Sequence, residues 1–363
     1  MLAQQNLVET SFNKRKKIIS VSKHTADFVD ISDEWQNAKK TDITAIDLFC
    51  GCGGISKGLG EAGIDVLLGV DFFKEAGETY SHNFDHEFLF GDLTKDEVKA
   101  NLYNKVKQKL NGKQLNIIAG GFPCQGFSMS GKRDLNDPRN RLYLDMLDIV
   151  NTLQPEFILM ENVKGLRSMD GGKVEQRILN DFKNIGYDVN IEVLNAADFE
   201  VSQKRERVIF VGNRIGRNNF HPKPIIQNGA YKTTKDAIED LMKCKENIDF
   251  NHVATKHNSD MQQRLMEVSE GKGLYANYSD SWKKCPWNEP SCTIKENHGG
   301  VNIHPKLPRV LTVRECARIQ SFDDKFIFKG TKSKQLKQIG NAVPPKLAKA
   351  VGLAIIKSYE EKK

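Results

Sequence analysis

Residues 45–54 read AIDLFCGCGG, a short apolar run that leads directly into a loop of cysteines and glycines. Similar apolar runs recur along the chain, and each ends in small or polar residues: Ala45–Phe49, Val66–Val70, Phe88–Phe90, Leu115–Ala119, Phe157–Met160 and Val208–Val211. Amphipathic stretches such as Leu142–Leu153 and Val174–Ile185 lie between several of them. Strands that alternate with helices predict an α/β fold, with a mostly parallel sheet and helices on both faces.

The alternation fails between residues 215 and 308, where proline and glycine breaks predict a separate, irregular and smaller domain. Beyond it, Thr312 and Glu315 have the spacing of a capping box, and another helix is expected over Lys346–Tyr359. The expected organisation is an N-terminal extension, a first α/β part, the irregular domain and a return to the α/β domain, over residues 1–40, 41–214, 215–308 and 309–363. Composition predicts a frayed tail or one accessory helix for the extension.

Composition excludes several classes of protein. The chain has 363 residues with 39% hydrophobic and 28% charged residues, and no apolar run approaches the length of a membrane span. The N-terminus has no apolar signal core, which argues against secretion. Seven cysteines without a CxxC pair argue against a disulfide framework or a structural zinc site. We therefore expect a protein of the reducing cytoplasm, without membrane contact.

Positive charge is concentrated near the C-terminus. The whole chain has a formal net charge of +7, whereas residues 301–363 contain 14 lysines and arginines against five acidic residues. This excess fits contacts to the phosphates of a nucleic acid through Arg309, Arg314, Arg318 and the lysines of residues 325–337, but many ordinary enzymes carry as much net charge. A solvated helix face would have the same composition.

Acidic residues follow several of the predicted strands. Asp71 follows Val70, Asp92 comes two residues after Phe90, and Glu161 follows Met160. In open α/β sheets, ligands bind outside the carboxyl ends of the strands. These residues therefore predict one binding site along that edge.

The loop at residues 51–54 and Asp71 have features of a dinucleotide site. Glycines let a ligand approach the backbone at a helix N-terminus, and Asp71 lies twenty residues after Gly51, a spacing suited to a ribose hydroxyl. However, Ser56 stands where such sites have their third glycine, which weakens a nicotinamide interpretation. Cys50 and Cys52 lie too close together for a usual zinc site and are expected to be small packing residues.

A second loop offers a nucleophile. Residues 120–130 read GGFPCQGFSMS and place Cys124 at a strand end, although most lone cysteines are buried and inert. Glu161 could be kept protonated by burial and act as a general acid, or it could simply cap a helix entry. In QKRER at residues 203–207, alternation puts Arg205 and Arg207 on the same face. A solvated strand edge is the plainer interpretation of that segment.

Taken together, these segments resemble the cytosine-C5 DNA methyltransferases of bacterial restriction-modification systems, over about residues 43–363 apart from the irregular stretch. The segments DLFCGCGG, VD, GDL, GGFPCQGFS, ENV, QKRERVIFVG, RVLTVRECARIQSF and QIGNAVPP occur in the order typical of that family. The resemblance implies a Rossmann-like S-adenosylmethionine-dependent methyltransferase fold, with a target-recognition domain at residues 215–308. Asp71 and Cys50 depart from the residues common in the family, glutamate and alanine.

The resemblance also implies roles for individual residues. Cys124 would be the nucleophile, Glu161 would contact cytosine N3, and Arg205 and Arg207 would hold the target base. S-adenosylmethionine would be bound, without any metal, by Phe49, Gly51, Gly53, Gly54, Asp71, Phe72, Asp92, Leu93, Pro123, Leu142, Asn341 and Ala342. In particular, Asp71 would contact the ribose and Asp92 the adenine amino group.

The implied reaction is methylation of a cytosine flipped out of double-stranded DNA, through a covalent bond between Cys124 and cytosine C6. We expect a monomer, and a cognate restriction endonuclease acting separately would complete the system. The sequence leaves open whether that partner exists and which DNA sequence is the target. The alternatives are the same chemistry on transfer RNA, a nicotinamide oxidoreductase and a catalytically inactive DNA-binding regulator; the intact Cys124, Glu161 and Arg207 argue against the last.

Overall fold

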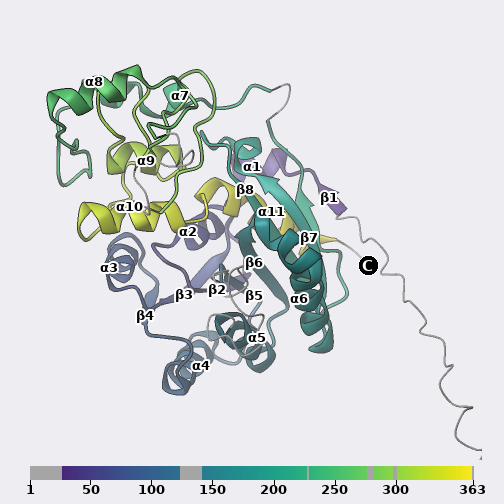
Figure 1. Ribbon diagram of the computed structural model, residues 1–363. Coiled ribbons are helices and arrows are strands. Elements are labelled where there is room, and N and C mark those ends of the chain that lie inside the picture. Colours follow the sequence, from purple (N-terminus) through teal and green to yellow (C-terminus); the bar gives the residue numbers. More distant parts are fainter. Residues whose placement is uncertain (1–26, 123–140, 227–228, 276–281, 297–300, 362–363) are drawn as a thin grey trace, which may run out of the picture.

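The computed structural model describes residues 27–122, 141–226, 229–275, 282–296 and 301–361 (Figure 1). The strands are β1 (Asp27–Val29), β2 (Thr44–Leu48), β3 (Asp65–Asp71), β4 (Glu87–Phe90), β5 (Ile117–Gly120), β6 (Phe157–Val163), β7 (Asp188–Asn195), β8 (Glu206–Asn213) and β9 (Phe220–Pro222). The α-helices are α1 (Ser32–Asn37), α2 (Gly54–Glu61), α3 (Lys74–Asn83), α4 (Asp96–Leu110), α5 (Arg141–Leu153), α6 (Lys173–Asn184), α7 (Thr234–Ile238), α8 (Ser259–Glu267), α9 (Val313–Ile319), α10 (Lys332–Asn341) and α11 (Pro345–Glu360).

A seven-stranded sheet in the order β4-β3-β2-β5-β6-β8-β7 forms the centre of the molecule. The strands from β4 to β6 are parallel, whereas β8 is antiparallel to both of its neighbours. The predicted α/β class and mostly parallel sheet are confirmed. β7 was not predicted, because it is an edge strand whose residues are only partly buried and include Asn190 and Glu192.

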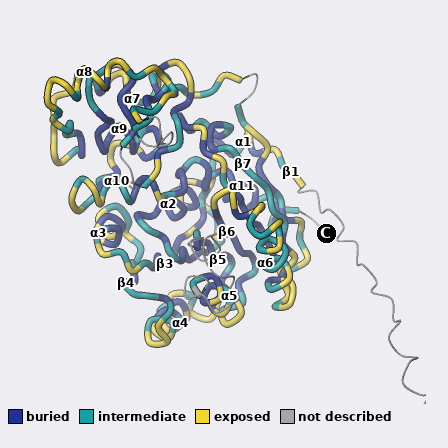
Figure 2. The backbone as a smooth tube through the Cα atoms, viewed as in Figure 1, coloured by how far each residue is buried: buried dark blue, intermediate teal, exposed yellow. Residues whose placement is uncertain are grey.

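Helices cover both faces of the sheet. On one face, Ile55 and Leu59 of α2 and Leu347 of α11 pack in one core cluster with strand residues such as Ala45. On the other face, side chains of α4, α5 and α6 pack against strand residues that include Ile46. Figure 2 shows the strands largely buried and the outer sides of α4 and α6 exposed. Because both faces are covered, the loops at the strand ends remain the accessible part of the sheet.

The N-terminal segment is more firmly attached than composition suggested. β1 pairs in parallel with β9, and Ile31 and Trp35 are buried in the same core cluster as α11. The Lys349 ammonium lies 4.8 Å from the centre of the Trp35 ring and donates a 2.6 Å hydrogen bond to the Trp35 carbonyl oxygen. The expected accessory helix is therefore present as α1, whereas residues 1–26 lie outside the described part of the chain.

A smaller domain with its own core lies beside the sheet (Figure 1). Its core includes Ile238, Trp287 and Ile294 but also α9, with Cys316 and Phe322 beyond the expected boundary at residue 308. At the other end, Ile215 and Ile225 pack against the core of the sheet rather than in this domain. The expected domain bounds at residues 215 and 308 stay a prediction, since this cluster also includes Cys52 of the glycine loop. The predicted capping box of α9 is confirmed in both directions.

Close packing of α11 on α2 makes one glycine sensitive to substitution. A Cβ atom at Gly58 would lie 2.3 Å from the Pro345 carbonyl oxygen, whereas one at Gly60 would meet no heavy atom within 4 Å. We expect Gly58→Ala to lower the free energy of unfolding by about 1–3 kcal/mol through overpacking. Gly60→Ala, in the same helix, should leave stability unchanged or raise it by up to about 1 kcal/mol. Urea unfolding of both variants checks this, and equal effects would contradict it.

Candidate active site

The carboxyl ends of the parallel strands bring the predicted site residues to one edge of the sheet. The chain changes direction across the sheet between β2 and β5, which is where open α/β sheets bind ligands. Asp71 is the last residue of β3 and Glu161 belongs to β6, whereas Phe49 to Gly54 follow β2, Phe72 follows β3, and Asp92 and Leu93 follow β4. The pattern of strand ends therefore locates one site.

Glu161 and Arg207 form an ion pair at this edge. The Arg207 Nε lies 2.7 Å from Glu161 Oε1, and the two side chains are only 13% and 12% exposed. Antiparallel pairing of β6 with β8 brings them together, since Val163 lies opposite Arg207 and Glu161 opposite Ile209. A carboxylate and a guanidinium on adjacent strands can bind the polar edge of a heterocyclic base from two directions.

The loop that leads toward Cys124 begins beside this pair. The Asn162 side chain donates a buried 3.0 Å hydrogen bond to the Phe122 carbonyl oxygen. A Cβ atom at Gly121 would lie 3.2 Å from Glu161 Oε2, so the backbone at Gly121 passes close to that carboxylate oxygen. Pro123 and Cys124 themselves lie outside the described residues. Asn162 thus anchors the last described residue before them.

The glycine loop after β2 is held by Asp71 at the end of β3. The Gly51 and Phe73 N–H groups each donate a 2.8 Å hydrogen bond to the Asp71 carboxylate, one to each oxygen. Burial raises the pKa of Asp71, and these backbone hydrogen bonds oppose the shift. Gly53 has φ +93°, and a Cβ atom there would lie 2.3 Å from the Phe84 ring, so the turn requires glycine. Each Asp71 oxygen keeps capacity for a further donor.

Close packing requires glycine at position 54, in addition to the binding role predicted for Gly54. A Cβ atom at this position would lie 2.2 Å from the Val343 carbonyl oxygen. The turn that contains Asn341 and Ala342 therefore approaches the glycine loop closely. Cys50 and Cys52 are buried, and burial raises the pKa of both thiols, which fits the expectation of packing residues.

The remaining predicted cofactor residues differ in their exposure. Phe72 presents an apolar ring that is 60% exposed, whereas Leu93 is buried. Asp92 is half-buried, and its Oδ1 accepts a 2.9 Å hydrogen bond from the Thr94 N–H. Leu142, at the start of α5, is also half-buried. An exposed aromatic face next to carboxylates suits a nucleoside, whose base can stack and whose hydroxyls donate.

A buried polar chain below the glycine loop was not predicted. Ser56 donates to Asp47 Oδ2 from both its N–H, at 3.0 Å, and its hydroxyl, at 2.7 Å. The Ser56 hydroxyl also lies 2.8 Å from the Tyr80 hydroxyl, which lies 2.7 Å from His86 Nε2. Burial raises the pKa of Asp47 to about 7. Ser56, the departure from the dinucleotide pattern, therefore fixes the start of α2.

Arg205 differs from Arg207 in its surroundings. Arg205 is 1% exposed, and its guanidinium donates to the carbonyl oxygens of Ile294, Gly340 and Ala342 at 2.9–3.0 Å. The resemblance implied that both Arg205 and Arg207 hold the target base. Among the described contacts, only Arg207 pairs with Glu161, whereas Arg205 is used to hold backbone segments together.

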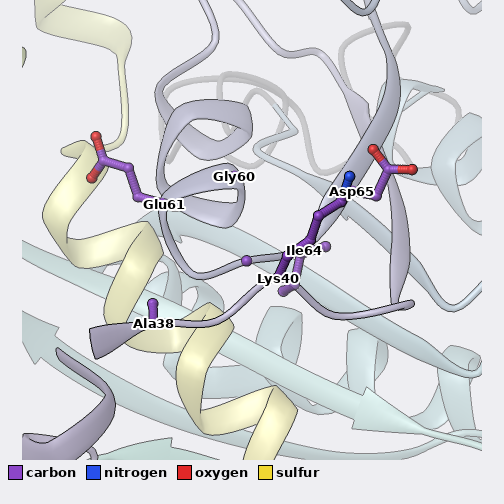
Figure 3. Close-up of a pocket in the computed structure, with 7 residues that line it drawn as sticks. Ala38, Lys40, Gly60, Glu61, Ile64 and Asp65 are labelled. Carbon is purple, nitrogen blue, oxygen red and sulfur yellow. The ribbon is translucent and has the colours of Figure 1, made fainter. Parts of the chain in front are cut away.

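A cleft of about 730 Å³ opens between the sheet and the smaller domain. Its lining includes Arg207 together with Asn341 of the predicted cofactor turn. Basic side chains on its walls come from Lys164, Lys204 and Lys295. A further hollow, of about 250 Å³, lies beside Gly60, Ile64 and Asp65 at the opposite end of β3 (Figure 3). Of these two hollows, the larger one adjoins the predicted site residues.

The arginines of the basic C-terminal segment are engaged inside the protein. Arg314 is fully buried and donates to three backbone carbonyl oxygens at 2.8–3.0 Å. Arg309 forms a bidentate pair with Glu315, and Arg318 forms one with Asp324. The expected phosphate contact is wrong for Arg314, because a buried side chain cannot reach a ligand. The other two arginines are already paired with carboxylates.

None of the helices in the described ranges is long and apolar enough to cross a membrane. Within the same ranges, no group of three or more histidine, cysteine, aspartate or glutamate side chains is arranged to hold a metal ion.

The sheet order, with antiparallel β8 between β6 and β7, and the glycine loop at the end of β2 define a Rossmann-like methyltransferase fold. A family model described as C-5 cytosine-specific DNA methylase matches residues 43–357. The chain belongs to this family.

Relatives and solved structures agree with this assignment. The chain is 37% identical to the type II methyltransferase M1.HphI of Haemophilus parahaemolyticus, over 87% of each protein. It is 32% identical to M.DdeI of Desulfomicrobium norvegicum, over 88% of this chain and 89% of that protein. The structure of a putative DNA modification methyltransferase from an E. coli prophage matches with a TM-score of 0.71 and 28% identity, covering 88% of this chain and all of that one.

Proposed function

We propose that this protein transfers a methyl group from S-adenosylmethionine to C5 of a cytosine in double-stranded DNA. The observation that carries the proposal is the Glu161–Arg207 ion pair, whose arginine lines the cleft and whose carboxylate lies beside the backbone of Gly121. This pair lies where the loop bearing Cys124 begins. Membership of the cytosine-C5 DNA methylase family supplies the substrate class.

The described residues fit S-adenosylmethionine. The exposed ring of Phe72 offers a stacking surface for adenine, and Asp71 and Asp92 offer acceptors for a ribose hydroxyl and an amino group. Asn341, Ala342 and Leu142 would complete the pocket. When bound there, the sulfonium would supply an already activated methyl group, so the reaction needs no metal.

The chain's own residues would make cytosine reactive. C5 of cytosine is a weak nucleophile, so the Cys124 thiolate would first form a bond to C6 while N3 receives a proton from Glu161. The resulting enamine is nucleophilic at C5, where the methyl group is attached. A base then removes the C5 proton, N3 returns its proton to Glu161, the double bond re-forms, and the bond between C6 and Cys124 breaks to release the thiolate. Arg207 would hold the base edge and Glu161 in register.

This chemistry requires the base to leave the DNA stack, because C6 is inaccessible inside a duplex. The cleft between the sheet and the smaller domain is large enough to admit a nucleotide, and Lys164, Lys204 and Lys295 line it. Lysines at such positions suit the DNA backbone, and Lys164 and Lys204 would exchange their carboxylate partners, Glu206 and Glu289, for phosphates. The smaller domain would read the target sequence. A cognate restriction endonuclease that acts separately would fit the relatives' type II systems, and a monomer suffices for this arrangement.

Methyl sequencing of DNA from cells that express the protein tests the proposal. 5-Methylcytosine at one short sequence is the expected result, and cells expressing Cys124→Ser should show none. Purified protein is then given DNA and transfer RNA side by side with tritiated cofactor. Label on transfer RNA alone would replace the DNA assignment, and label on neither would overturn the methyltransferase proposal.

Phe72 provides a test of the cofactor pocket, with a matched control at the neighbouring strand end. Phe72 and Phe90 are 60% and 59% exposed, and each lies at the carboxyl end of its strand. Because base–aromatic stacking contributes about 1–3 kcal/mol, Phe72→Ala should weaken cofactor binding by roughly 5- to 150-fold. Phe90→Ala should leave the Kd nearly unchanged. Calorimetric titration with S-adenosylhomocysteine measures both, and an unchanged Kd for Phe72→Ala would remove Phe72 from the pocket.

A further inference from the structure

Three chain segments meet beside the cleft: residues 202–205 before β8, residues 291–296 of the smaller domain, and residues 339–342 at the end of α10. The first two run side by side. The Ser291 N–H donates to the Ser202 carbonyl oxygen at 2.8 Å, and the Lys204 N–H donates to the Ser291 carbonyl oxygen at 2.9 Å. The Thr293 hydroxyl adds a 2.8 Å hydrogen bond to the Lys204 carbonyl oxygen.

Two buried glutamines, Gln203 and Gln320, connect the first two segments to the third. Gln203 Oε1 accepts a 2.8 Å hydrogen bond from the Ile294 N–H, and its amide donates to Gln320 Oε1. The Gln320 amide in turn donates to the carbonyl oxygens of Ile339, at 3.0 Å, and Ala342, at 2.9 Å. Both glutamines are 0% exposed. The pair is thus a buried polar connection from the smaller domain to the predicted cofactor turn.

The place where residues 202–205, 291–296 and 339–342 meet, here called the junction, is tightly packed, so the segments have little room to move relative to one another. Arg205 bonds the Ile294 carbonyl oxygen as well as those of Gly340 and Ala342. A Cβ atom at Gly340 would lie 2.3 Å from the Glu296 backbone nitrogen, so the two backbones are in direct contact. Since buried polar groups that lose their partners are costly, movement of one segment is expected to shift the other two.

Each segment leads to a different part of the proposed site. Arg207, which pairs with Glu161, lies two residues beyond Arg205. Asn341, of the predicted cofactor pocket, follows Gly340 and donates a 3.0 Å hydrogen bond to Glu296. Residues 291–296 continue from the smaller domain, which would contact DNA. The junction therefore connects the base site, the cofactor turn and the DNA-reading domain.

We propose that Gln203 and Gln320 are positioning residues that couple DNA binding to cofactor binding, an inference that rests on the proposed function. DNA held by the smaller domain would fix residues 291–296 and, through the two glutamines, the turn at 339–342. Bound DNA would then raise the affinity for the cofactor, and by thermodynamic reciprocity the cofactor would raise the affinity for DNA by the same factor.

The test measures the Kd of S-adenosylhomocysteine for the full-length protein, with and without a saturating duplex that carries the methylated target sequence. DNA should lower this Kd by about 5- to 150-fold in the unaltered protein. Gln320→Met and Gln203→Met should reduce the factor to within about twofold of unity while the Kd without DNA changes far less. The double variant should lose no more coupling than either single one, because the two side chains act as a unit.

Gln338→Met is the matched control. Gln338 is also a buried glutamine near the turn, but its side chain bonds the Thr79 hydroxyl, at 2.6 Å, and the Lys329 carbonyl oxygen, at 3.0 Å, rather than Gln203 or residues 291–296. It should retain the full coupling factor. If the glutamine variants do not fold, Thr293→Val removes one hydrogen bond from the same junction and should lower the factor.

The outcomes separate this inference from the proposed function. Failure of the unaltered protein to methylate DNA would reject the function. Methylation with no coupling, full coupling in Gln320→Met, or equal loss in Gln338→Met would reject the inference alone. Where only Thr293→Val can be measured, an unchanged coupling factor would reject it as well.

Discussion

Cys124→Ser is expected to lower the rate of methyl transfer by at least about 10⁴-fold, the scale on which removal of a covalent nucleophile acts. A serine hydroxyl is a far weaker nucleophile than a thiolate, so the bond to cytosine C6 would not form and C5 would remain unreactive. DNA binding should change little, because the two side chains differ by a single atom. Tritiated methyl transfer to a duplex carrying the target sequence measures the loss.

A trapping experiment identifies the covalent step itself. When fluorine replaces hydrogen at C5 of the target cytosine, C5 has no proton to lose after methyl transfer. The bond between C6 and Cys124 should therefore persist through denaturing electrophoresis. Cys124→Ser should give no such complex. Cys244→Ser is the control, since Cys244 is an exposed thiol in the smaller domain and should behave as the unaltered protein. A trapped complex that survives Cys124→Ser would assign the bond to another residue.

Glu161→Gln is expected to slow methyl transfer by about 10²- to 10⁴-fold, the usual contribution of a general acid or base. Glutamine has nearly the same shape and can still accept the hydrogen bond from the Arg207 Nε, which lies 2.7 Å from Glu161 Oε1. It cannot deliver a proton to cytosine N3. The rate in a single-turnover assay should therefore fall much more than the affinity for DNA.

Glu156→Gln is the matched control for this prediction. Glu156 directly precedes β6, at the end of the strand opposite the cleft, and accepts hydrogen bonds from Asn116, at 2.6 Å, and Tyr359, at 2.8 Å. The single-turnover rate of this variant should match that of the unaltered protein. If Glu161→Gln weakens DNA binding as much as it slows the reaction, Glu161 is a structural residue.

Much of the architecture could be predicted from local patterns. The apolar runs at residues 45–49 and 66–70 coincide with β2 and β3, and the capping box at Thr312 and Glu315 begins α9. These features are local, because a strand buried on both faces needs a continuous apolar run and a capping box joins residues three apart. β7 was missed because an edge strand is only half-buried and carries a weaker pattern.

The distribution of the arginines could not be predicted in the same way. Composition suggested that Arg314 contacts phosphate, yet its partners are carbonyl oxygens of Phe250, Asp323 and Phe326. Phe250 is 64 residues away along the chain. Charge along a sequence does not reveal whether a side chain is buried, because burial depends on contacts distant in sequence.

The sequence by itself determined the family and the alternation of strands and helices along most of the chain. The tertiary structure alone decided that Glu161 pairs with Arg207 across two antiparallel strands, whereas Arg205 turns to the backbone of Ile294 and Gly340. The glycine loop at the end of AIDLFCGCGG is likewise packed by a distant residue. Val343 lies almost three hundred residues later in the chain, and its backbone packs against Gly54. Local patterns specify elements, but a site is built from contacts between elements, and these exist only once the chain has folded.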